Sequence, residues 1–124
     1  MPVTKHFNAN PTFETDIDGT VKALKRAVFA STSGDVVPAV TGKKIKVYAY
    51  AIQSGGAGAV CQLKDGSGGA NLTIGWEFDS REGVAPSTIK PPAYLFSTSP
   101  GVSLYAQITG TIRVEVSYWD DDAV

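Results

Sequence analysis

The chain has 124 residues, of which 43% are hydrophobic and 19% are charged, and its formal net charge is −1 at pH 7. This is the composition of one ordinary globular domain, and it excludes a chain that is disordered throughout. No apolar run approaches the roughly 20 residues that a membrane-spanning helix requires, and no apolar segment follows a basic N-terminal end, so we expect neither a membrane span nor a secretory signal.

Residues 1–19 are expected to form an extended arm. Phe7 and Phe13 are isolated apolar residues among Asn, Pro, Thr and Asp, and the segment shows no strand period. A segment of this kind either frays or packs on a neighbouring molecule. We therefore divide the chain into an arm, 1–19, and a β-sandwich domain, 20–124, and treat Phe7 and Phe13 as candidate interface residues.

Residues 20–31 fit two periods. Helical spacing fits Val21, Leu24, Lys25 and Val28, whereas strand spacing fits Leu24, Arg26, Val28 and Ala30. The segment leads into a turn rich in Ser and Gly and then into another short apolar run. We therefore favour a strand.

The segment 43–52 alternates most clearly and predicts a strand with unlike faces. The alternation predicts that one face carries Ile45, Val47, Ala49 and Ala51, and that the opposite face carries Lys44, Lys46, Tyr48 and Tyr50. Tyr48 and Tyr50 are then outward-facing aromatic residues without a partner. We treat both as candidate interface residues.

The rest of the chain consists of short apolar runs between turns. Further strands are predicted at 36–40, 59–64, 72–78, 93–97, 102–108 and 111–118. Clusters of Gly and Pro separate them, and 80–90 is expected to be an irregular loop. The sequence therefore predicts an all-β fold, a jelly-roll-like antiparallel β-sandwich of about eight short strands with an extended N-terminal arm.

Residues 16–20 read Asp-Ile-Asp-Gly-Thr, which matches the signature of haloacid-dehalogenase-like phosphotransferases. In that family the first Asp is a nucleophile at the end of a buried strand of a parallel α/β sheet. Here the preceding residues, 12–15, are not continuously apolar, and the chain is too short for such a sheet with a second acidic cluster. We expect a surface turn at this position.

Other candidate sites are weaker. Gly42-Lys43 and 66–69 each lack the remainder of a phosphate-binding loop, and we interpret both as turns. Residues 120–122 are three consecutive Asp residues at the C-terminus, where solvated charge is the expectation. His6 is the only histidine, and the lone Cys61 is expected to be buried. We therefore expect no enzyme, no catalytic residues, no metal site and no cofactor.

Charge is unevenly distributed along the chain. Between Thr20 and Lys64 seven basic residues stand against one acid, whereas from Asp65 onward eight acids stand against three basic residues. The asymmetry can reflect the docking of unlike surfaces, or it can vanish when the two halves interleave in a sandwich. The basic residues form no dense run, so we expect no nucleic-acid partner.

Aromatic residues on the predicted strands allow two interpretations. The set comprises Trp76, Trp119, Tyr48, Tyr50, Tyr94 and Tyr105. Such residues can stack on sugar rings, as in a jelly-roll lectin, but core or interface packing is their more common role. Carbohydrate binding therefore remains an alternative.

Two successive motifs carry a family resemblance. The first is Ser33-Gly34-Asp35-x-Val37-x-Ala39-Val40-x-Gly42-Lys43-Lys44-Ile45-Lys46-Val47-x-Ala49-Tyr50, and the second is Val60-x-x-Leu63-Lys64-Asp65-Gly66-Ser67-Gly68-Gly69-x-x-Leu72-Thr73. This pattern resembles small structural proteins of tailed bacteriophages, in particular capsid decoration (cement) proteins, over roughly residues 20–119.

The resemblance implies a homotrimeric jelly roll on the exterior of the capsid, as part of the virion. The implied partners are the major capsid protein and further copies of the chain, with no membrane and no nucleic acid. Related domains also occur in phage fibres and tail adhesins. The alternative is therefore a receptor- or carbohydrate-binding module of a tail or fibre.

Overall fold

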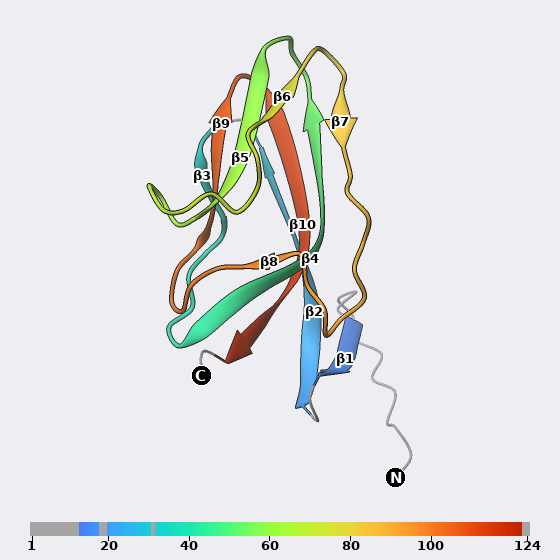
Figure 1. The fold of residues 1–124 in the computed structure, drawn as a ribbon, viewed down its shortest axis with the longest axis vertical. Helices are drawn as coiled ribbons and strands as arrows, with labels where there is room; N and C mark the ends of the chain where they lie inside the picture. Colours follow the sequence, from blue (N-terminus) through green and yellow to red (C-terminus); the bar gives the residue numbers. More distant parts are fainter. Residues whose placement is uncertain (1–12, 18–19, 31, 123–124) are drawn as a thin grey trace.

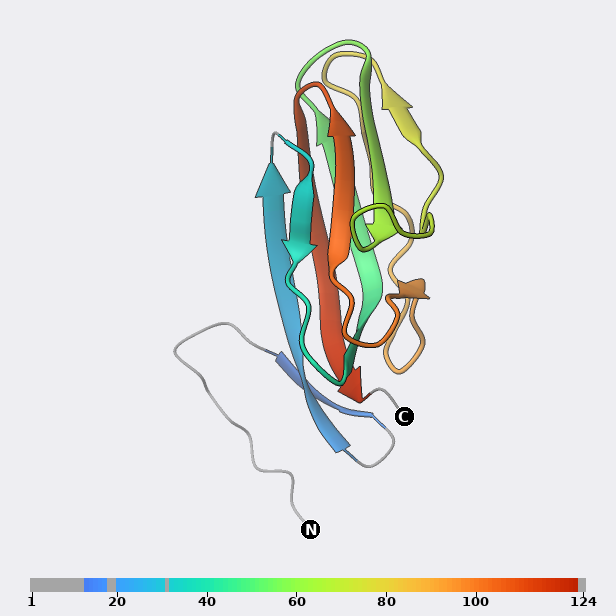
Figure 2. The same ribbon diagram turned by 90° about the vertical axis from the view of Figure 1, so that its left-hand side faces the viewer.

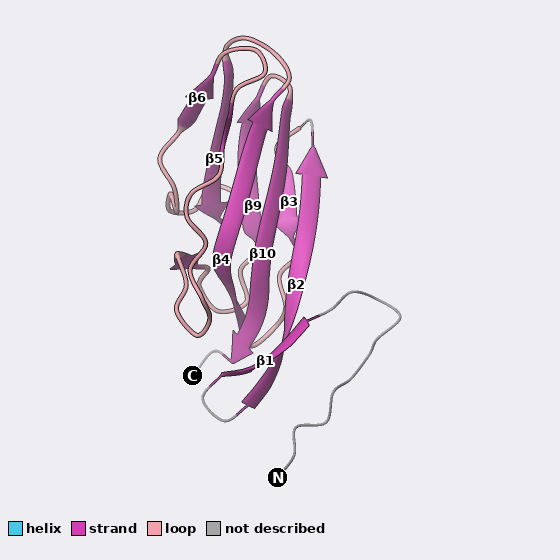
Figure 3. Cartoon of the chain, turned by 90° about the vertical axis from the view of Figure 1, so that its right-hand side faces the viewer, coloured by secondary structure: helices cyan, strands magenta, loops and turns pink. Residues whose placement is uncertain are grey.

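The structure of the protein, a computed structural model, describes residues 13–17, 20–30 and 32–122. These residues form strands and loops only (Figure 3). The strands are β1 (Phe13–Ile17), β2 (Thr20–Ala30), β3 (Gly34–Val37), β4 (Lys43–Ser54), β5 (Ala59–Asp65), β6 (Trp76–Phe78), β7 (Gly83–Val84), β8 (Phe96–Ser97), β9 (Leu104–Thr109) and β10 (Ile112–Asp122). The all-β prediction is confirmed, and the ambiguous segment after residue 20 is a strand.

The strands form two antiparallel sheets that pack face to face (Figures 1 and 2). One sheet has the order β1-β2-β10-β4-β7, with β8 also paired to β4, and the other has the order β3-β9-β5-β6. From β2 onward, the chain has the connectivity of a jelly roll. One layer contains β2, β10, β4 and β7, and the layer that faces it contains β3, β9, β5 and β6. The predicted jelly-roll-like sandwich is therefore confirmed.

The core lies between the two sheets, where period-two alternation turns one face of each long strand inward. Its fully buried side chains include Ile45, Ile52, Leu63, Leu104, Ile112, Val114 and Val116. Cys61 is buried among them, as predicted, and burial raises the pKa of its thiol to about 12. Cys61 is therefore a small apolar core residue and not a nucleophile.

The register between β4 and β10 shifts at one residue. Ser117 lies opposite Ala49, but the next residue, Tyr118, lies opposite Val47, which leaves Tyr48 as an extra residue in β4. An extra residue on one strand of an antiparallel pair is a β-bulge. Because side chains alternate with a period of two, one extra residue reverses which side chains point inward beyond it.

The bulge overturns the predicted faces of this strand. Beyond it, Tyr50 and Ile52 point into the core, with exposed fractions of 9% and 1%, whereas Ala49 and Ala51 lie on the outer face and are only half-buried. The prediction that Tyr50 faces outward is therefore wrong. The alternation of residues within β4 cannot reveal the bulge, because the extra residue is defined only by the pairing of β4 with β10.

Part of the expected arm is also a strand. β1 pairs antiparallel with the first part of β2, from Phe13 opposite Leu24 to Ile17 opposite Thr20. This hairpin lies beyond one end of the sandwich (Figures 1 and 3), and within the described chain β1 pairs with β2 alone. The sequence did not predict this strand, because a paired strand needs no alternating pattern when β2 supplies its backbone partners.

Candidate functional site

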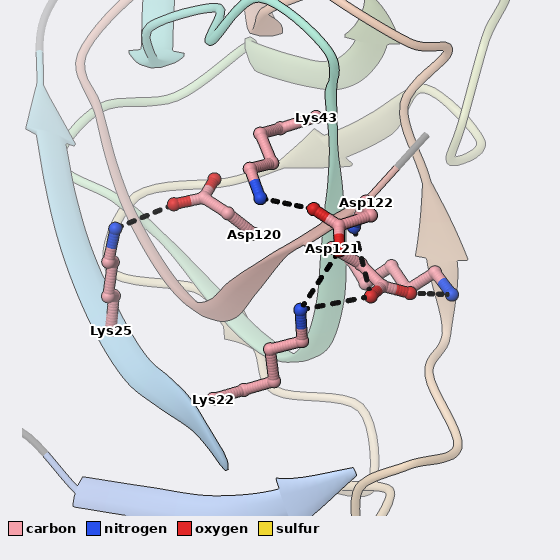
Figure 4. Close-up of polar contacts among 7 residues, drawn as sticks. Lys22, Lys25, Lys43, Asp120, Asp121 and Asp122 are labelled. Atoms are coloured by element: carbon pink, nitrogen blue, oxygen red, sulfur yellow. Dashed lines mark hydrogen bonds and ion pairs between the residues drawn. The ribbon is translucent and has the colours of Figure 1, made fainter. Parts of the chain in front are cut away.

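The end of β10 forms what we call the charged end, in which acids of β10 lie between lysines of the two flanking strands (Figure 4). Its members are Asp120, Asp121 and Asp122 on β10, Lys22 and Lys25 on β2, and Lys43 and Lys46 on β4. Residues 120–122 are thus part of a paired strand, and the expectation that they are solvated terminal charge is wrong. Pairing with β4, in which Asp122 lies opposite Lys43, brings the opposite charges together.

Four lysines bind the three carboxylates. Lys25 Nζ lies 2.6 Å from Asp120 Oδ2, and Lys46 Nζ lies 2.6 Å from Asp121 Oδ2. Lys22 Nζ lies 3.6 Å from Asp121 Oδ1 and 3.9 Å from Asp122 Oδ2, and Lys43 donates a hydrogen bond to Asp122. The cluster joins β2 and β4 to the last residues of β10. In this part of β10, the backbone of β2 no longer pairs with it in the sheet.

The charged states of these groups stabilise one another. The hydrogen bond from Lys46 lowers the pKa of Asp121, and the hydrogen bond from Lys43 lowers the pKa of Asp122. Likewise, the hydrogen bond to Asp120 raises the pKa of Lys25. Asp121, Asp122 and Lys25 are therefore ionised around neutral pH.

An aromatic cluster lies on the outer face beside the charged end. Trp119 is opposite Lys46, is fully buried, and packs against Tyr48 and Tyr94, with ring centroids 6.0 and 6.3 Å away. Tyr94 is 43% exposed, and Lys46 Nζ lies 4.7 Å from the centroid of its ring. Stacking on a ligand requires an exposed ring, so Tyr94 and not Trp119 is the residue of this cluster that a sugar can reach.

Two polar atoms at this end are buried without a hydrogen-bond partner among the described residues, Trp119 Nε1 and Asp120 Oδ1. They lie on opposite faces of β10, because Trp119 is opposite the outward Lys46 and Asp120 is opposite the buried Ile45. The two atoms therefore do not form one site.

The second tryptophan packs in a different place. Trp76 Nε1 donates a hydrogen bond of 3.3 Å to the hydroxyl of Tyr50, whose ring centroid lies 5.7 Å from that of Phe96. Burial raises the pKa of Tyr50. Tyr50 is therefore buried within the subunit.

The structure places three of the four predicted interface residues in different surroundings. Tyr48 lies at the bulge on the outer face, Tyr50 lies in the core, and Phe13 is the first residue of β1. Phe7 lies outside the described residues. Sequence reasoning did not find the charged end, although the uneven charge along the chain was its signal.

The uneven distribution of charge along the chain is explained by the pairing of unlike charges in the folded sheet. The lysines of β2 and β4 pair with the acids of β10, and Arg26 Nη2 lies 2.6 Å from Glu115 Oε1 on the same sheet. At these positions, much of the asymmetry along the sequence is thus neutralised by pairing within the folded subunit.

The remaining motifs show no chemistry in the part of the chain that the structure describes. The Asp-x-Asp-Gly-Thr motif joins two antiparallel neighbours, since Ile17 lies opposite Thr20, whereas the phosphotransferase signature requires a parallel sheet. Gly42, Gly66 and Gly68 have positive φ angles of 75°, 76° and 74° and form turns, as predicted. Across 13–17, 20–30 and 32–122, no group of three His, Cys, Asp or Glu residues could hold a metal ion.

Comparison of the chain with family models, with curated proteins and with solved structures found no match. No helix long and apolar enough to cross a membrane occurs in the described residues.

Proposed function

We propose that this protein is a structural virion protein, a cement protein that binds the outer surface of a phage head and stabilises the shell. In this proposal it acts as a homotrimer, its partner is the major capsid protein, and it has no catalytic role. The observation that carries the proposal is a jelly-roll body with the β1–β2 hairpin beyond one end. The resemblance of residues 20–119 to decoration proteins supports the same assignment.

The two parts of the molecule suit two tasks. Jelly rolls recur in viral capsid proteins and in lectins, where a closed double sheet forms a rigid body. An isolated two-stranded hairpin is at best marginally stable in water, and among the described strands β1 pairs with β2 alone. A capsid surface on which the hairpin docks would supply the missing contacts.

The mechanism of such a protein is linkage. A protein that binds only the assembled shell, across neighbouring capsid subunits, stabilises that shell by mass action. Burial of Phe7 and Phe13 on a neighbour would contribute about 1.5–3 kcal/mol each before ordering costs. Repeated over three subunits at each trimer site, contributions of this size are enough to matter for a shell under internal pressure.

The proposal is tested by adding the purified protein to phage heads that lack decoration. The full chain should co-sediment with the heads, raise the temperature at which they rupture, and give trimeric density on the outer surface in electron micrographs. Light scattering on the free protein should give the mass of three chains, and a monomer at micromolar concentration would contradict the trimer.

Two variants separate docking from folding. Deleting residues 2–19 should abolish head binding while the circular dichroism spectrum of the sandwich stays nearly unchanged. Ile74→Ser is the matched control, because Ile74 is 65% exposed in the loop between β5 and β6, away from the hairpin. Undiminished head binding by the deletion variant would show that the arm and hairpin are not the docking element.

The alternative is a receptor- or carbohydrate-binding module of a tail or fibre. The observation that favours it is Tyr94, an exposed ring beside the ammonium group of Lys46. Glycan-array binding that is lost in Tyr94→Ala, with the fold intact, would favour this alternative over the capsid role.

A further inference from the structure

β2 changes its partner strand along its length. Residues 25–30 pair with β10, and residues 20–24 pair with β1. The two ladders meet between Leu24, which lies opposite Phe13, and Lys25, which lies opposite Tyr118. We call β1 together with residues 20–24 the hairpin segment. In the described part of the chain, no ladder pairs this segment with another strand of the sandwich (Figure 3).

Lys22 connects the hairpin segment to the end of β10 (Figure 4). Its Nζ lies 3.6 Å from Asp121 Oδ1 and 3.9 Å from Asp122 Oδ2. The side chain is only 12% exposed, which is the lowest exposed fraction of any ion-paired side chain in the described residues. Because partial burial reduces screening by water and salt, an ion pair in this position keeps more of its strength than a fully exposed one.

The two carboxylates are also held from the other side, by β4. Lys46 Nζ lies 2.6 Å from Asp121 Oδ2, and Lys43 donates a hydrogen bond to Asp122. Backbone pairing between β10 and β4 continues as far as Asp122, opposite Lys43. The acids therefore keep their place and a partner when Lys22 is lost. The hairpin segment is the part that moves when this contact breaks.

The hairpin segment depends on contacts of this kind. A two-stranded hairpin on its own is at best marginally stable in water. Segments with few packed neighbours open with much less free energy than the whole domain needs to unfold. An ion pair that is small on the scale of the whole subunit is therefore large on the scale of this segment.

We propose that Lys22 is a positioning residue that holds the hairpin segment against the end of β10 through Asp121 and Asp122. When these ion pairs break, the hairpin segment separates from the sandwich at the junction of Leu24 and Lys25, and the sandwich stays folded. This is a property of the free protein. Its consequence for docking, a hairpin presented to the phage head in one direction, rests on the proposed function.

The test is amide hydrogen exchange in the free, full-length protein at low salt. Lys22→Met keeps the apolar stem of the side chain and removes its charge. Amides of 13–17 and 20–24 should then exchange about fivefold faster, the factor to which about 1 kcal/mol corresponds. Amides of 25–30 and 44–52 should exchange at the rates of the unmodified protein.

Two further variants separate the charge of Lys22 from the charge of the cluster. Lys22→Arg should restore the protection of the hairpin segment, because a guanidinium group binds carboxylates well. Lys43→Met is the matched control, since it removes a lysine of the same cluster that comes from β4 and not from β2. It should leave exchange in the hairpin segment unchanged.

Salt provides a measurement that needs no substitution. Raising the salt from about 0.05 M to about 1 M should speed exchange in the hairpin segment of the unmodified protein and have no such effect in Lys22→Met. The proposal is overturned by unchanged exchange in Lys22→Met, by an equal rise in Lys43→Met, by a rise throughout the sandwich, or by a hairpin segment that is already unprotected in the unmodified protein. None of these measurements contains phage heads, so their failure is distinguishable from a failure of the proposed function.

Discussion

Lys46 of β4 and Asp121 of β10 form an ion pair in which Nζ lies 2.6 Å from Oδ2, and both side chains are mostly covered, with exposed fractions of 19% and 23%. The same ammonium group lies 4.7 Å from the centre of the Tyr94 ring. Lys46 therefore links the end of β10 to the loop before β8. Partial burial reduces screening by water and salt, so this pair is expected to be stronger than the exposed pairs of the sheet.

Asp121→Asn removes this charge while keeping the shape of the side chain. We expect it to lower the free energy of unfolding by about 1 kcal/mol, at the upper end of the range for exposed ion pairs because Lys46 loses a partly buried partner. Denaturant unfolding measures the loss. Glu115→Gln is the control, because its pair with Arg26 is more exposed and its removal should cost less. An equal loss in both variants would contradict this ranking.

Stability should fall in acid because of the charged end. The pKa values of Asp121 and Asp122 lie below their ordinary value of 3.8 in the folded chain. A carboxylate with a lowered pKa stabilises the fold fully above its unfolded pKa and loses that contribution as the pH falls through its folded pKa. Unfolding measured as a function of pH should show this loss below about pH 4, and the loss should be smaller in Asp121→Asn. An identical acid profile in both proteins would show that other carboxyl groups dominate.

Lys25 makes the free energy of unfolding depend on pH in the opposite direction. Its pKa is raised above the ordinary value of 10.5 by the hydrogen bond to Asp120. A base with a raised pKa stabilises the fold below its unfolded pKa, and the contribution is lost as the pH rises through the folded pKa. Lys25→Met should therefore weaken the decline of stability above pH 10.5, measured by the same unfolding method, whereas an unaltered alkaline profile would exclude a contribution from this pair.

Deleting Tyr48 tests the bulge. Without the extra residue, Ala49 opposite Ser117 directly follows Val47 opposite Tyr118, so a regular ladder forms and every other residue of β4 keeps its partner and its face. We therefore expect this variant to fold and to lose only the contact of the Tyr48 ring with Trp119, about 0.5–1.5 kcal/mol in the free energy of unfolding. Deleting Ala51 is the comparison, because it closes the bulge only if Tyr50 turns to the outer face, and it should cost more. Denaturant unfolding measures both losses, and a Tyr48 deletion as damaging as the Ala51 deletion would refute the bulge.

The aromatic cluster gives a further stability prediction. Trp119 is fully buried, so Trp119→Ala should lower the free energy of unfolding by about 3–5 kcal/mol. Tyr94 is partly exposed and contributes one edge-to-face contact, so Tyr94→Ala should cost only about 0.5–1.5 kcal/mol. Thermal or denaturant unfolding of the two variants checks the order, and comparable losses would show that Trp119 is not the centre of the cluster.

The sequence by itself predicts the sheet architecture because its evidence is local. Alternation in 111–118 and the Gly-rich turns around Gly42 and Gly66 depend only on neighbouring residues, and they identify most strands and the sandwich. The same local evidence underlies the expectation that Cys61 is buried. These features follow from backbone geometry and from the period of side chains along a strand.

Tertiary structure alone decided which residues meet. The extra residue at Tyr48 is visible only against β10, and it moves Tyr50 from the outer face to the core. The three terminal Asp residues become a paired cluster only because β10 lies between β2 and β4, whose lysines are separated from them by at least 70 residues of sequence. The physical reason is that period-two alternation specifies two faces for a strand but neither its partners nor its register, and those depend on how the whole sheet is assembled.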